Sequence, residues 1–369
     1  MPEATLQPPK RFLFGPGPTQ VEPRVSEALA KQVVGPLDPY FFEVADRTRE
    51  LLRSVFGTRN EVTFPISGTG SSGMETAVAN FVEPDSKFAV FASGYFCDRL
   101  SEMGKRQGAR VARLEKPWGE VFSYEEAAEF VLREKPDVLA FVHAETSTGA
   151  LQNPRLITQA ARDVGALVIA DTVTSLGALP VNIDDVGIDV AYSCSQKGLS
   201  CPPGLSPFTA SPRAMERLKD RKSPMRHWYL DLKLICEYYD SRKYHHTVSS
   251  TLFYALHESL RLIEEEGLQN RFDRHQRNHL ALVRGLESMG LRMHVAEDHR
   301  LPNVNTPRVP EGVDDARVRK HLIDKHGIEI AGGFGPLAGK IFRIGLMGPL
   351  ANESCVKMFL AAFQDALRV

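Results

Sequence analysis

"VLAFVHAETSTGALQNPRLITQAARDVGALVIAD", residues 138–171, holds two short apolar runs on either side of a segment with helical spacing. The runs 138–142 and 166–170 are apolar throughout, which is typical of strands buried on both faces. The segment 154–164 between them predicts a helix. A strand, a helix and a second strand in this order predict two parallel strands in one sheet that is covered by helices.

The same alternation continues on both sides of this unit, with helices of about 10–15 residues between short apolar runs. We therefore expect an α/β fold whose sheet is mostly parallel and covered on both faces. Further helices are predicted at 70–81, from the end of the strand 87–92 to about 108, and at 123–134, with Ser123 as the N-cap. Further strands are predicted at 61–66, 87–92, 110–114, 190–193 and 205–209.

The two ends of the chain differ from this middle part. The first twenty residues contain "PPKRFLFGPGPTQ", with six prolines or glycines, and are predicted to form an arm, 1–20, without a regular element. A large domain is predicted at 21–255. Two long helices, at 251–267 and 270–289, then lead into smaller elements, so we expect a small C-terminal α+β domain at 256–369.

Composition excludes several classes of function. The net charge is −1 and no long basic or acidic block occurs, so nucleic acids and anionic membranes are not expected as partners. No apolar stretch is long enough to span a bilayer, and the first residues lack the pattern of a secretory signal. The five cysteines are widely scattered, which predicts reduced thiols in a cytoplasmic enzyme, without a disulfide framework and without a metal site.

A glycine-rich loop, "ISGTGSSGMETA" at 66–77, has the G-x-G-x-x-G spacing of a dinucleotide-binding turn. A dinucleotide site also needs an acidic residue at the tip of the next strand, but the strand 87–92 is followed by Ser93 and Gly94. NAD is therefore disfavoured. The loop still leaves a strand and opens a helix, so it offers hydroxyls and free N–H groups to an anion such as a single phosphate. A plain glycine-rich turn is the alternative.

Polar residues follow three other strands at the edge where ligands bind in open α/β sheets. Thr146 lies in a hydroxyl cluster after 138–142, Asp171 follows 166–170, and Lys197 follows 190–193. Taken singly, these residues fit a turn residue, a helix cap and a surface lysine. Together with the anion loop they fit pyridoxal phosphate, which needs a lysine for its aldehyde, an acid for its ring nitrogen and a helix start for its phosphate.

At this point the sequence resembles a family, the alanine–glyoxylate and serine–pyruvate aminotransferases of the class V, fold-type I pyridoxal-phosphate enzymes. The resemblance runs from about residue 12 to the C-terminus. It implies a large cofactor domain with a mostly parallel sheet and a smaller C-terminal domain. The segments that carry it are "GPGPTQVEPRV", "ISGTGSSGMETAVAN", "ETSTGALQNP", "ADTVTSLGALPV", "YSCSQKGLSCPPGLS", "YHHT" and "FRIGLMGP".

The resemblance also implies roles for single residues. Lys197 would form the internal aldimine, Asp171 would hold the pyridine nitrogen, and Val173 would pack under the ring. Thr146 would approach the phenolic oxygen and Phe96 would stack on the ring, where many relatives carry tryptophan. The phosphate would be bound by residues of the loop and of one neighbouring strand end, namely Gly68, Thr69, Gly70, Ser71 and Gln196. Relatives often have histidine or threonine in place of Ser71.

Two further groups follow from the resemblance. Tyr244 and Thr247 would reach the phosphate of the other subunit, which implies a homodimer with an active site shared across the interface. Arg343 would bind the substrate carboxylate, with Ser175 and Gly17 as further substrate-binding residues. A guanidinium suits this task because its two parallel donors match a carboxylate.

The expected activity is transfer of the amino group of a small amino acid, alanine or serine, to glyoxylate or pyruvate by a ping-pong mechanism. The same scaffold also serves transamination of 2-aminoethylphosphonate or ureidoglycine, and lyases or desulfurases. A desulfurase needs a cysteine on a flexible loop, whereas "NESCVKM", which contains Cys355, reads as the start of a helix. A binding or scaffold protein with a decayed site is disfavoured because the lysine, the aspartate and the loop are all present. The sequence leaves the amino donor open.

Overall fold

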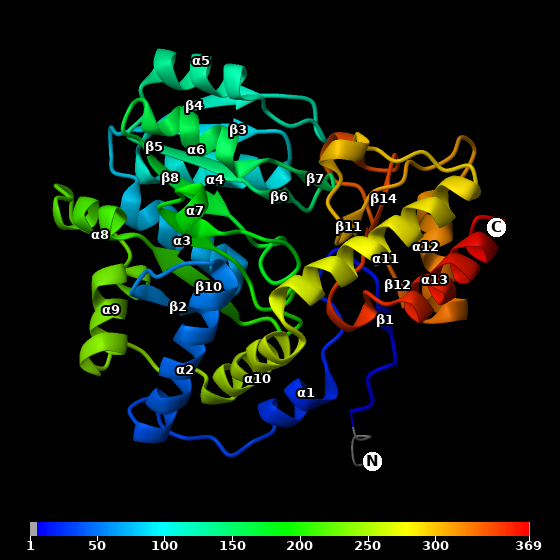
Figure 1. Ribbon diagram of the computed structural model, residues 1–369, viewed down its shortest axis with the longest axis horizontal. Coiled ribbons are helices and arrows are strands. Elements are labelled where there is room, and N and C mark those ends of the chain that lie inside the picture. Colours follow the sequence, from blue (N-terminus) through cyan, green and yellow to red (C-terminus); the bar gives the residue numbers. More distant parts are fainter. Residues whose placement is uncertain (1–5, 369) are drawn as a thin grey trace, which may run out of the picture.

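The computed structural model describes residues 6–368 as a large and a small body that meet along one side (Figure 1). The large body is built on a seven-stranded sheet with the order β2-β10-β9-β8-β5-β3-β4. Every neighbouring pair is parallel except those of β10, which runs antiparallel to both β2 and β9. The seven strands are β2 (Val62–Ser67), β3 (Lys87–Ala92), β4 (Arg110–Glu115), β5 (Val138–Val142), β8 (Leu167–Asp171), β9 (Val190–Tyr192) and β10 (Leu205–Ala210).

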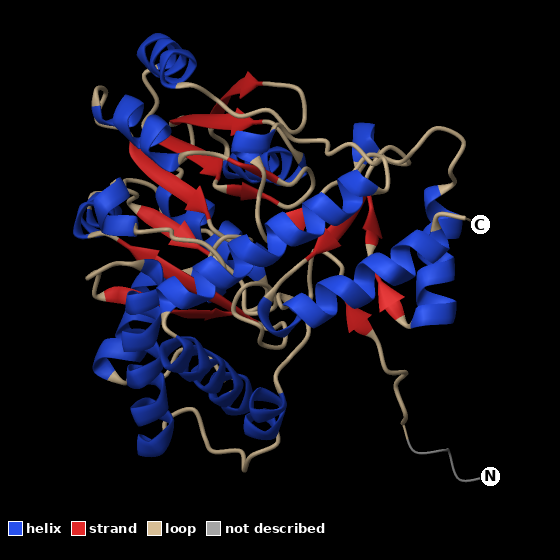
Figure 2. Ribbon diagram, turned by 45° about the vertical axis from the view of Figure 1, so that its right-hand side comes forward, coloured by secondary structure: helices blue, strands red, loops and turns tan. Residues whose placement is uncertain are grey.

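The predicted α/β class with a mostly parallel sheet is therefore confirmed. The central strands β5 and β8 are buried at every position because helices pack on both faces of the sheet (Figure 2). The helices of the large body are α1 (Pro23–Leu29), α2 (Pro39–Phe56), α3 (Gly70–Phe81), α4 (Tyr95–Gln107), α5 (Tyr124–Glu134), α6 (Pro154–Arg162), α7 (Ile183–Val186), α8 (Pro212–Lys219), α9 (Leu232–Ser241) and α10 (Ser250–Glu266).

The predicted cap of α5 is present as a capping box. The Ser123 hydroxyl accepts a hydrogen bond from the Glu126 N–H at 3.3 Å, and the Glu126 carboxylate accepts one from the Ser123 N–H at 2.8 Å. These two bonds satisfy donors that the first turn of a helix leaves free. They fix the start of α5 at the residue that the sequence indicates.

The small body packs three helices against short strands. Helix α11 (Leu268–Ser288) runs from the large body across to it (Figure 1), and α12 (Asp315–His326) and α13 (Glu353–Ala366) complete the layer. A three-stranded antiparallel sheet has the order β11-β14-β13. The strands of this part are β11 (Val304–Asn305), β12 (Ile328–Glu329), β13 (Ala331–Gly332) and β14 (Phe342–Gly345).

The N-terminal arm belongs to the small body, which the sequence does not indicate. Strand β1 (Phe12–Leu13) pairs in parallel with β12, and Phe14 lies in the small hydrophobic core with its ring centroid 4.9 Å from that of Phe359. The prediction of an arm without regular elements is thus wrong for these two residues, because a two-residue strand is too short for a periodic signal. Residues 1–5 of the arm lie outside the described residues.

The extents of the two hydrophobic cores indicate where the boundary between the domains lies. The boundary predicted at 255 and 256 falls inside α10, and the large core extends along this helix to Ile263. The small core takes up residues of α11 from Leu282 onward. We therefore propose that Gly267, between α10 and α11, marks the change from one body to the other.

No helix of residues 6–368 is both long enough and apolar enough to span a membrane.

Candidate active site

The polar strand ends that the sequence indicates lie at one edge of the large sheet. Strands β2, β5, β8 and β9 run in the same direction, so their carboxyl ends meet at this edge, where ligands bind in open parallel sheets. The short hairpin of β6 (Ala144–Glu145) and β7 (Ala150–Leu151) lies directly after β5. It carries the hydroxyl cluster that contains Thr146.

Lys197 is a buried lysine, with 8% of its surface exposed. Its Nζ donates to the Pro16 carbonyl of the arm and to the Thr146 hydroxyl at 3.4 Å. Among residues 6–368 no carboxylate forms an ion pair with it. Burial lowers the pKa of the Lys197 amine to about 8, and the negative charge of the nearby Asp171 opposes only part of this effect, so a sizeable neutral fraction exists near physiological pH.

Gly17 lies against this lysine. Its φ of +125° is unfavourable for residues with a side chain, and a Cβ at this position would lie 3.0 Å from Lys197 Cγ and 3.1 Å from Nζ. Only glycine at position 17 lets the arm pass this close to the Lys197 amine. The predicted substrate-binding residue Gly17 is thus next to Lys197, and its contact with a substrate stays a prediction.

Asp171 is the last residue of β8 and is 2% exposed. Its Oδ1 accepts a hydrogen bond from the Val173 N–H at 2.8 Å, and its Oδ2 accepts one from the Tyr192 hydroxyl at 3.0 Å. Burial nevertheless raises the pKa of Asp171 to about 7. A buried carboxylate held in this way is suited to a cationic partner, which would restore its charge.

The glycine loop forms a cradle at the start of α3. Thr69 is the N-cap but makes no side-chain capping bond, so its hydroxyl is free together with the N–H groups of Gly70 and Ser71, whereas the Ser72 N–H donates to the Thr69 carbonyl at 2.8 Å. A Cβ on Gly70 would lie 3.1 Å from Val173 Cγ2, so the loop backbone packs tightly on the residue expected under the cofactor ring. Gln196 Oε1 is buried and has no partner among the described residues.

Phe96 lies in the first turn of α4, whose start is held by a buried carboxylate. Glu145 Oε2 accepts from the Phe96 N–H at 3.3 Å, and Glu145 Oε1 accepts from the Ser147 hydroxyl at 2.7 Å. Burial raises the pKa of Glu145. Glu145 therefore fixes the direction in which α4 leaves the sheet, and with it the place of the Phe96 ring.

Arg343 lies in β14 of the small body and is 4% exposed. Its Nε donates to the Gly332 carbonyl at 2.7 Å, and its guanidinium carbon lies 3.8 Å from the centroid of the Phe334 ring. Neither Nη atom has a hydrogen-bond partner within the described part of the chain. Burial lowers the pKa of Arg343 to about 10, which still leaves the group charged at neutral pH, with two parallel donors free for a carboxylate.

Comparison with known proteins agrees with this arrangement. The model of the aminotransferase class-V family matches residues 11–343. The chain belongs to the class V aminotransferase family. The (S)-ureidoglycine–glyoxylate transaminase of Bacillus subtilis is 38% identical over 97% of this chain and 91% of its own. The alanine–glyoxylate aminotransferase of Drosophila melanogaster is 38% identical over 98% of this chain and 94% of its own.

Among solved structures, the alanine–glyoxylate aminotransferase from Nostoc sp. superposes with a TM-score of 0.98 at 46% identity. The match covers 100% of this chain and 98% of that one. The expected family, the fold-type I architecture and the enzyme class are thereby confirmed. Members of the family transfer amino groups between amino acids and keto acids.

Two predicted cofactor residues of this aminotransferase lie at the surface of the chain. Tyr244 is 54% exposed, and its hydroxyl makes a 3.0 Å hydrogen bond to the exposed Thr247. The neighbouring His246 Nε2 lies 2.7 Å from the hydroxyl of Ser67, at the end of β2 just before the glycine loop. The segment therefore lies beside the loop, with the Tyr244 and Thr247 side chains at the surface.

Ser175 is fully buried, and its hydroxyl lies 2.9 Å from His143 Nδ1. Burial lowers the pKa of His143 to about 4, so this imidazole is neutral at physiological pH. The hydroxyl that the resemblance assigns to the substrate is therefore engaged by a neutral histidine. Its role toward the substrate stays a prediction.

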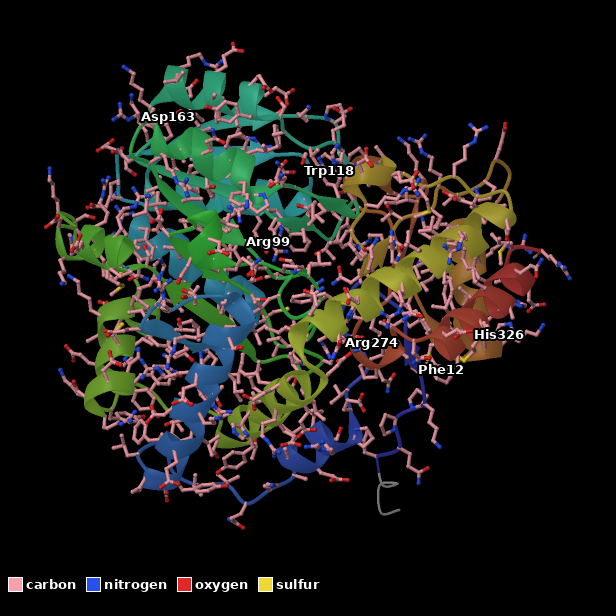
Figure 3. The ribbon with its side chains drawn as sticks, in the orientation of Figure 1. Phe12, Arg99, Trp118, Asp163, Arg274 and His326 are labelled. Atoms are coloured by element: carbon pink, nitrogen blue, oxygen red, sulfur yellow. The ribbon has the colours of Figure 1, made fainter. Side chains whose placement is uncertain are left out.

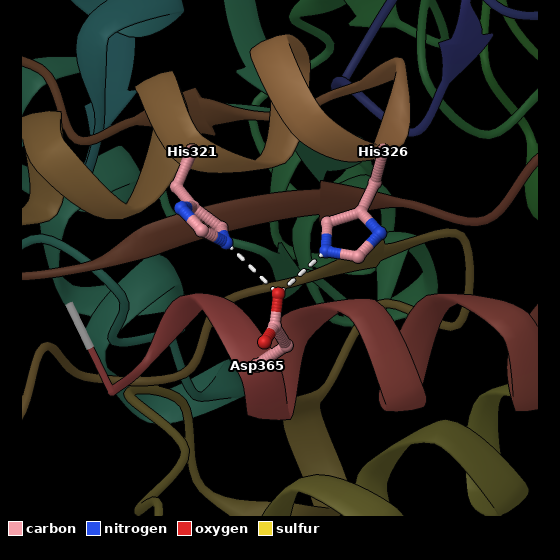
Figure 4. Close-up of side chains that lie close together, drawn as sticks. All are labelled: His321, His326 and Asp365. Atoms are coloured by element: carbon pink, nitrogen blue, oxygen red, sulfur yellow. Dashed lines mark hydrogen bonds and ion pairs between the residues drawn. The ribbon is translucent and has the colours of Figure 1, made fainter.

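One further cluster of this aminotransferase has ligand-like side chains. Ligand atoms of His321, His326 and Asp365 lie within 4.8 Å of one another (Figure 4). Each histidine Nε2 lies 2.8 Å from Asp365 Oδ2, and the Lys325 ammonium is 2.8 Å from the same oxygen. Because an ammonium already occupies the side of the carboxylate where a cation would bind, we interpret the cluster as an ion pair network that ties α12 to α13.

Several residues that shape the site are not indicated by the sequence. Four of them bond to partners 21 to 49 residues away, and the fifth, Phe334, stacks on Arg343 nine residues further along, so no local motif marks them. A partial signal exists for Arg99, which lies one helical turn after Phe96 and therefore on the same face of α4. The missed residues are Tyr192, Glu145, Arg99, His143 and Phe334.

Proposed function

We propose that this aminotransferase uses pyridoxal phosphate to move the amino group of a small amino acid, alanine or serine, to glyoxylate or pyruvate. The transfer takes place in two half-reactions, a ping-pong scheme, in which the enzyme stores the amino group between the two acids. The observation that carries the proposal is the buried, unpaired Lys197 amine at the same sheet edge as the buried Asp171 carboxylate and the glycine cradle.

The residues present fit this cofactor. Lys197 suits an aldehyde, Asp171 suits a protonated ring nitrogen, and the free donors at the start of α3 suit one phosphate. Gln196 Oε1 is buried and has no hydrogen-bond partner among the described residues, so a bound ligand could supply the missing donor. Pyridoxal phosphate would supply an aldehyde and an aromatic ring that can take up the electrons released when the substrate Cα loses its proton.

The chain's own residues explain how that proton moves. The Lys197 amine, with its pKa lowered to about 8 by burial, is neutral often enough to accept a proton and still basic enough to hold it. The arm limits its reach, because Pro16 accepts a hydrogen bond from the amine and Gly17 packs along its stem. Asp171 stays in place through Val173 and Tyr192 while its charge balances the ring nitrogen.

Arg343 would orient the substrate by its carboxylate. The Phe334 ring covers one face of the guanidinium, so the two free Nη donors are left in the plane that a carboxylate needs. The buried Glu145 carboxylate lies near enough to Arg343 to oppose part of the burial effect on its pKa. A donor with an acidic side chain would meet this negative charge, which supports a small uncharged donor.

The acceptor is better supported than the donor. The named relatives from Bacillus subtilis, Drosophila melanogaster and Nostoc sp. all carry glyoxylate in their names, but they differ between alanine and ureidoglycine as donor. Ureidoglycine is therefore the second candidate donor. Cys355 lies in the first turn of α13, next to its N-cap Asn352, so a sulfur-accepting cysteine on a flexible loop is not supported.

A panel of donors tests the proposal. Purified enzyme loaded with pyridoxal phosphate is mixed with alanine, serine, ureidoglycine or 2-aminoethylphosphonate, each with glyoxylate or pyruvate. We expect alanine or serine with glyoxylate to give the highest kcat/KM and to change the cofactor absorbance without any keto acid. If no amino acid changes the absorbance, the proposed function is wrong. If only ureidoglycine does so, the donor is wrong.

A homodimer would complete the site. Tyr244 and Thr247 are exposed beside the loop, and Trp228, 62% exposed, and Tyr229 add aromatic surface in the same region. Large exposed aromatic residues are typical of subunit interfaces. We propose that a second copy covers this surface and that its Tyr244 and Thr247 reach the phosphate of the first.

Hybrid dimers test the shared site. The inactive variant Lys197→Ala and the double variant Tyr244→Phe, Thr247→Val are mixed, dissociated and reassembled. One intact site forms per hybrid if the two groups come from different subunits, so about one quarter of wild-type activity returns. No return of activity would show that all three residues act within one chain.

We also propose that the enzyme acts in the cytoplasm. Its five cysteines are free thiols, which fits a reducing compartment.

A further inference from the structure

The proposed phosphate cradle lacks a charge of its own. Residues 68–73 contain no lysine or arginine. A phosphate monoester carries between about 1.5 and 2 negative charges at neutral pH. Hydroxyls and N–H groups can bind its oxygens, but they cannot neutralise this charge. A cation from another element is needed beside the loop.

We propose that Arg99 of α4 supplies this charge and is a phosphate-binding residue of the cofactor site; the proposal rests on the proposed function. Arg99 Nη1 donates a hydrogen bond of 2.7 Å to the hydroxyl of Ser71, in the first turn of α3. The guanidinium thus lies in the large body (Figure 3), beside the loop where the phosphate is expected.

The guanidinium is held in place by aromatic rings. Its carbon lies 5.0 Å from the centroid of the Phe96 ring and 5.5 Å from that of Tyr95. These distances are within the range of cation–π contacts, which orient arginine without neutralising it. Because Phe96 is also expected to stack on the cofactor ring, Arg99 connects the ring end of the site with the phosphate end.

No acidic side chain of residues 6–368 forms an ion pair with Arg99. The other arginines nearby are paired, Arg106 with Glu102 on the same helix and Arg113 with Asp98. Arg99 is half-buried and lies beside the glycine loop without a counter-ion, so it can bind an anion that comes from outside the chain.

His246, a second basic side chain beside the loop, cannot take this role. His246 Nε2 lies 2.7 Å from the Ser67 hydroxyl, but burial lowers the pKa of His246 to about 4. This imidazole is therefore neutral at physiological pH. Lys197 is assigned to the aldehyde end of the cofactor, which leaves Arg99 as the charge at the phosphate end.

The contact also gives a role to the small residue at position 71. The Ser71 hydroxyl oxygen accepts from Arg99, so its hydrogen is free to point elsewhere and donate to a phosphate oxygen. Arg99 would in this way bind the phosphate with its remaining N–H groups and orient Ser71 at the same time.

The test compares ligands with and without the phosphate. Dissociation constants of pyridoxal phosphate and of pyridoxal are measured by absorbance and fluorescence titration for wild type, Arg99→Gln, Arg99→Lys and the control Arg106→Gln. We expect Arg99→Gln to weaken pyridoxal phosphate binding roughly 10- to 100-fold, the effect of losing one charged hydrogen bond, and to leave pyridoxal binding nearly unchanged. Arg99→Lys should fall between, and Arg106→Gln should match wild type.

Equal effects of Arg99→Gln on both ligands, or no effect on either, would overturn the proposal and leave Arg99 a structural role. If Arg99→Gln does not fold, the milder Arg99→Lys still decides, because it keeps the charge but loses the planar donors. The ³¹P resonance of bound pyridoxal phosphate should then differ between wild type and this variant; an identical resonance contradicts the proposal. Failure of the wild type to bind pyridoxal phosphate would instead overturn the proposed function.

Discussion

Replacing the buried Asp171 by asparagine should stabilise the cofactor-free protein while it weakens the enzyme. Burial raises the pKa of this carboxylate to about 7 in the folded protein. In the unfolded chain the value is near 3.9. For an acid whose folded pKa lies above the unfolded one, ionisation opposes folding. The loss of stability begins above pH 4 and is complete above pH 7.

The size of the effect follows from these two values. Each pKa unit corresponds to about 1.4 kcal/mol, so ionised Asp171 costs roughly 4 kcal/mol of unfolding free energy at pH 8 and about 1.5 kcal/mol at pH 5. Asparagine has the same shape, and its carbonyl can still accept from the Val173 N–H. Any constant cost of the changed contact with Tyr192 cancels when two pH values are compared.

The assay is urea denaturation of the cofactor-free proteins, followed by circular dichroism between pH 5 and pH 8. The stability of Asp171→Asn relative to wild type should rise by about 2.5 kcal/mol over this range. Addition of pyridoxal phosphate should reverse the order, because only the carboxylate gains a charged partner. Parallel pH profiles of the two cofactor-free proteins would show that burial does not raise the pKa of Asp171.

Three further variants test other parts of the account. Gly17→Ala places a Cβ at 3.0 Å from Lys197 Cγ at a φ of +125°, so it should cost roughly 1–3 kcal/mol in thermal denaturation and reduce kcat; a wild-type melting curve and kcat would contradict the close approach of the arm. Phe334→Leu removes the ring 3.8 Å from the guanidinium of Arg343, the proposed substrate-binding residue, so KM for the amino donor should rise by about 2- to 30-fold in steady-state kinetics, whereas a change confined to kcat would argue against the stacking. Hydrogen bonds from Lys325, His321 and His326 hold the pKa of Asp365 well below its usual range, so the ionised carboxylate stabilises the fold above about pH 4 and this stabilisation is lost as the pH falls further. Asp365→Asn should therefore lower the melting temperature at pH 7, and the difference in melting temperature from wild type should become smaller in acid.

The main sheet of this chain is predictable because each strand carries its own signal. The runs 138–142 and 166–170 are apolar at every position. Short runs of this kind are typical of parallel strands that are buried on both faces. Helices α8 and α9 are absent from the prediction because they are short, with 8 and 10 residues, and lie in the polar connection between the predicted strand 205–209 and the predicted helix 251–267. Strand β1 depends on pairing with β12, some 300 residues away, so local sequence cannot reveal it.

Some residues of the candidate site can be predicted from the sequence and others cannot. Lys197 and Asp171 are predictable because each follows a strand, and parallel strands bring their ends together. Arg99 and Phe334 are not, because their importance arises from contacts across elements, with Ser71 in one case and with Arg343 in the other. Such contacts depend on how helices and bodies pack, which no short segment of the sequence encodes.

Peptide mapping shows directly which lysine of this aminotransferase binds the cofactor covalently. Purified enzyme is incubated with pyridoxal phosphate, reduced with borohydride, digested and analysed by peptide mass spectrometry. We expect one pyridoxyl-phosphate group per chain, attached to Lys197 in the peptide that contains "YSCSQKGLS". An unmodified Lys197, or a label spread over surface lysines, would contradict this prediction.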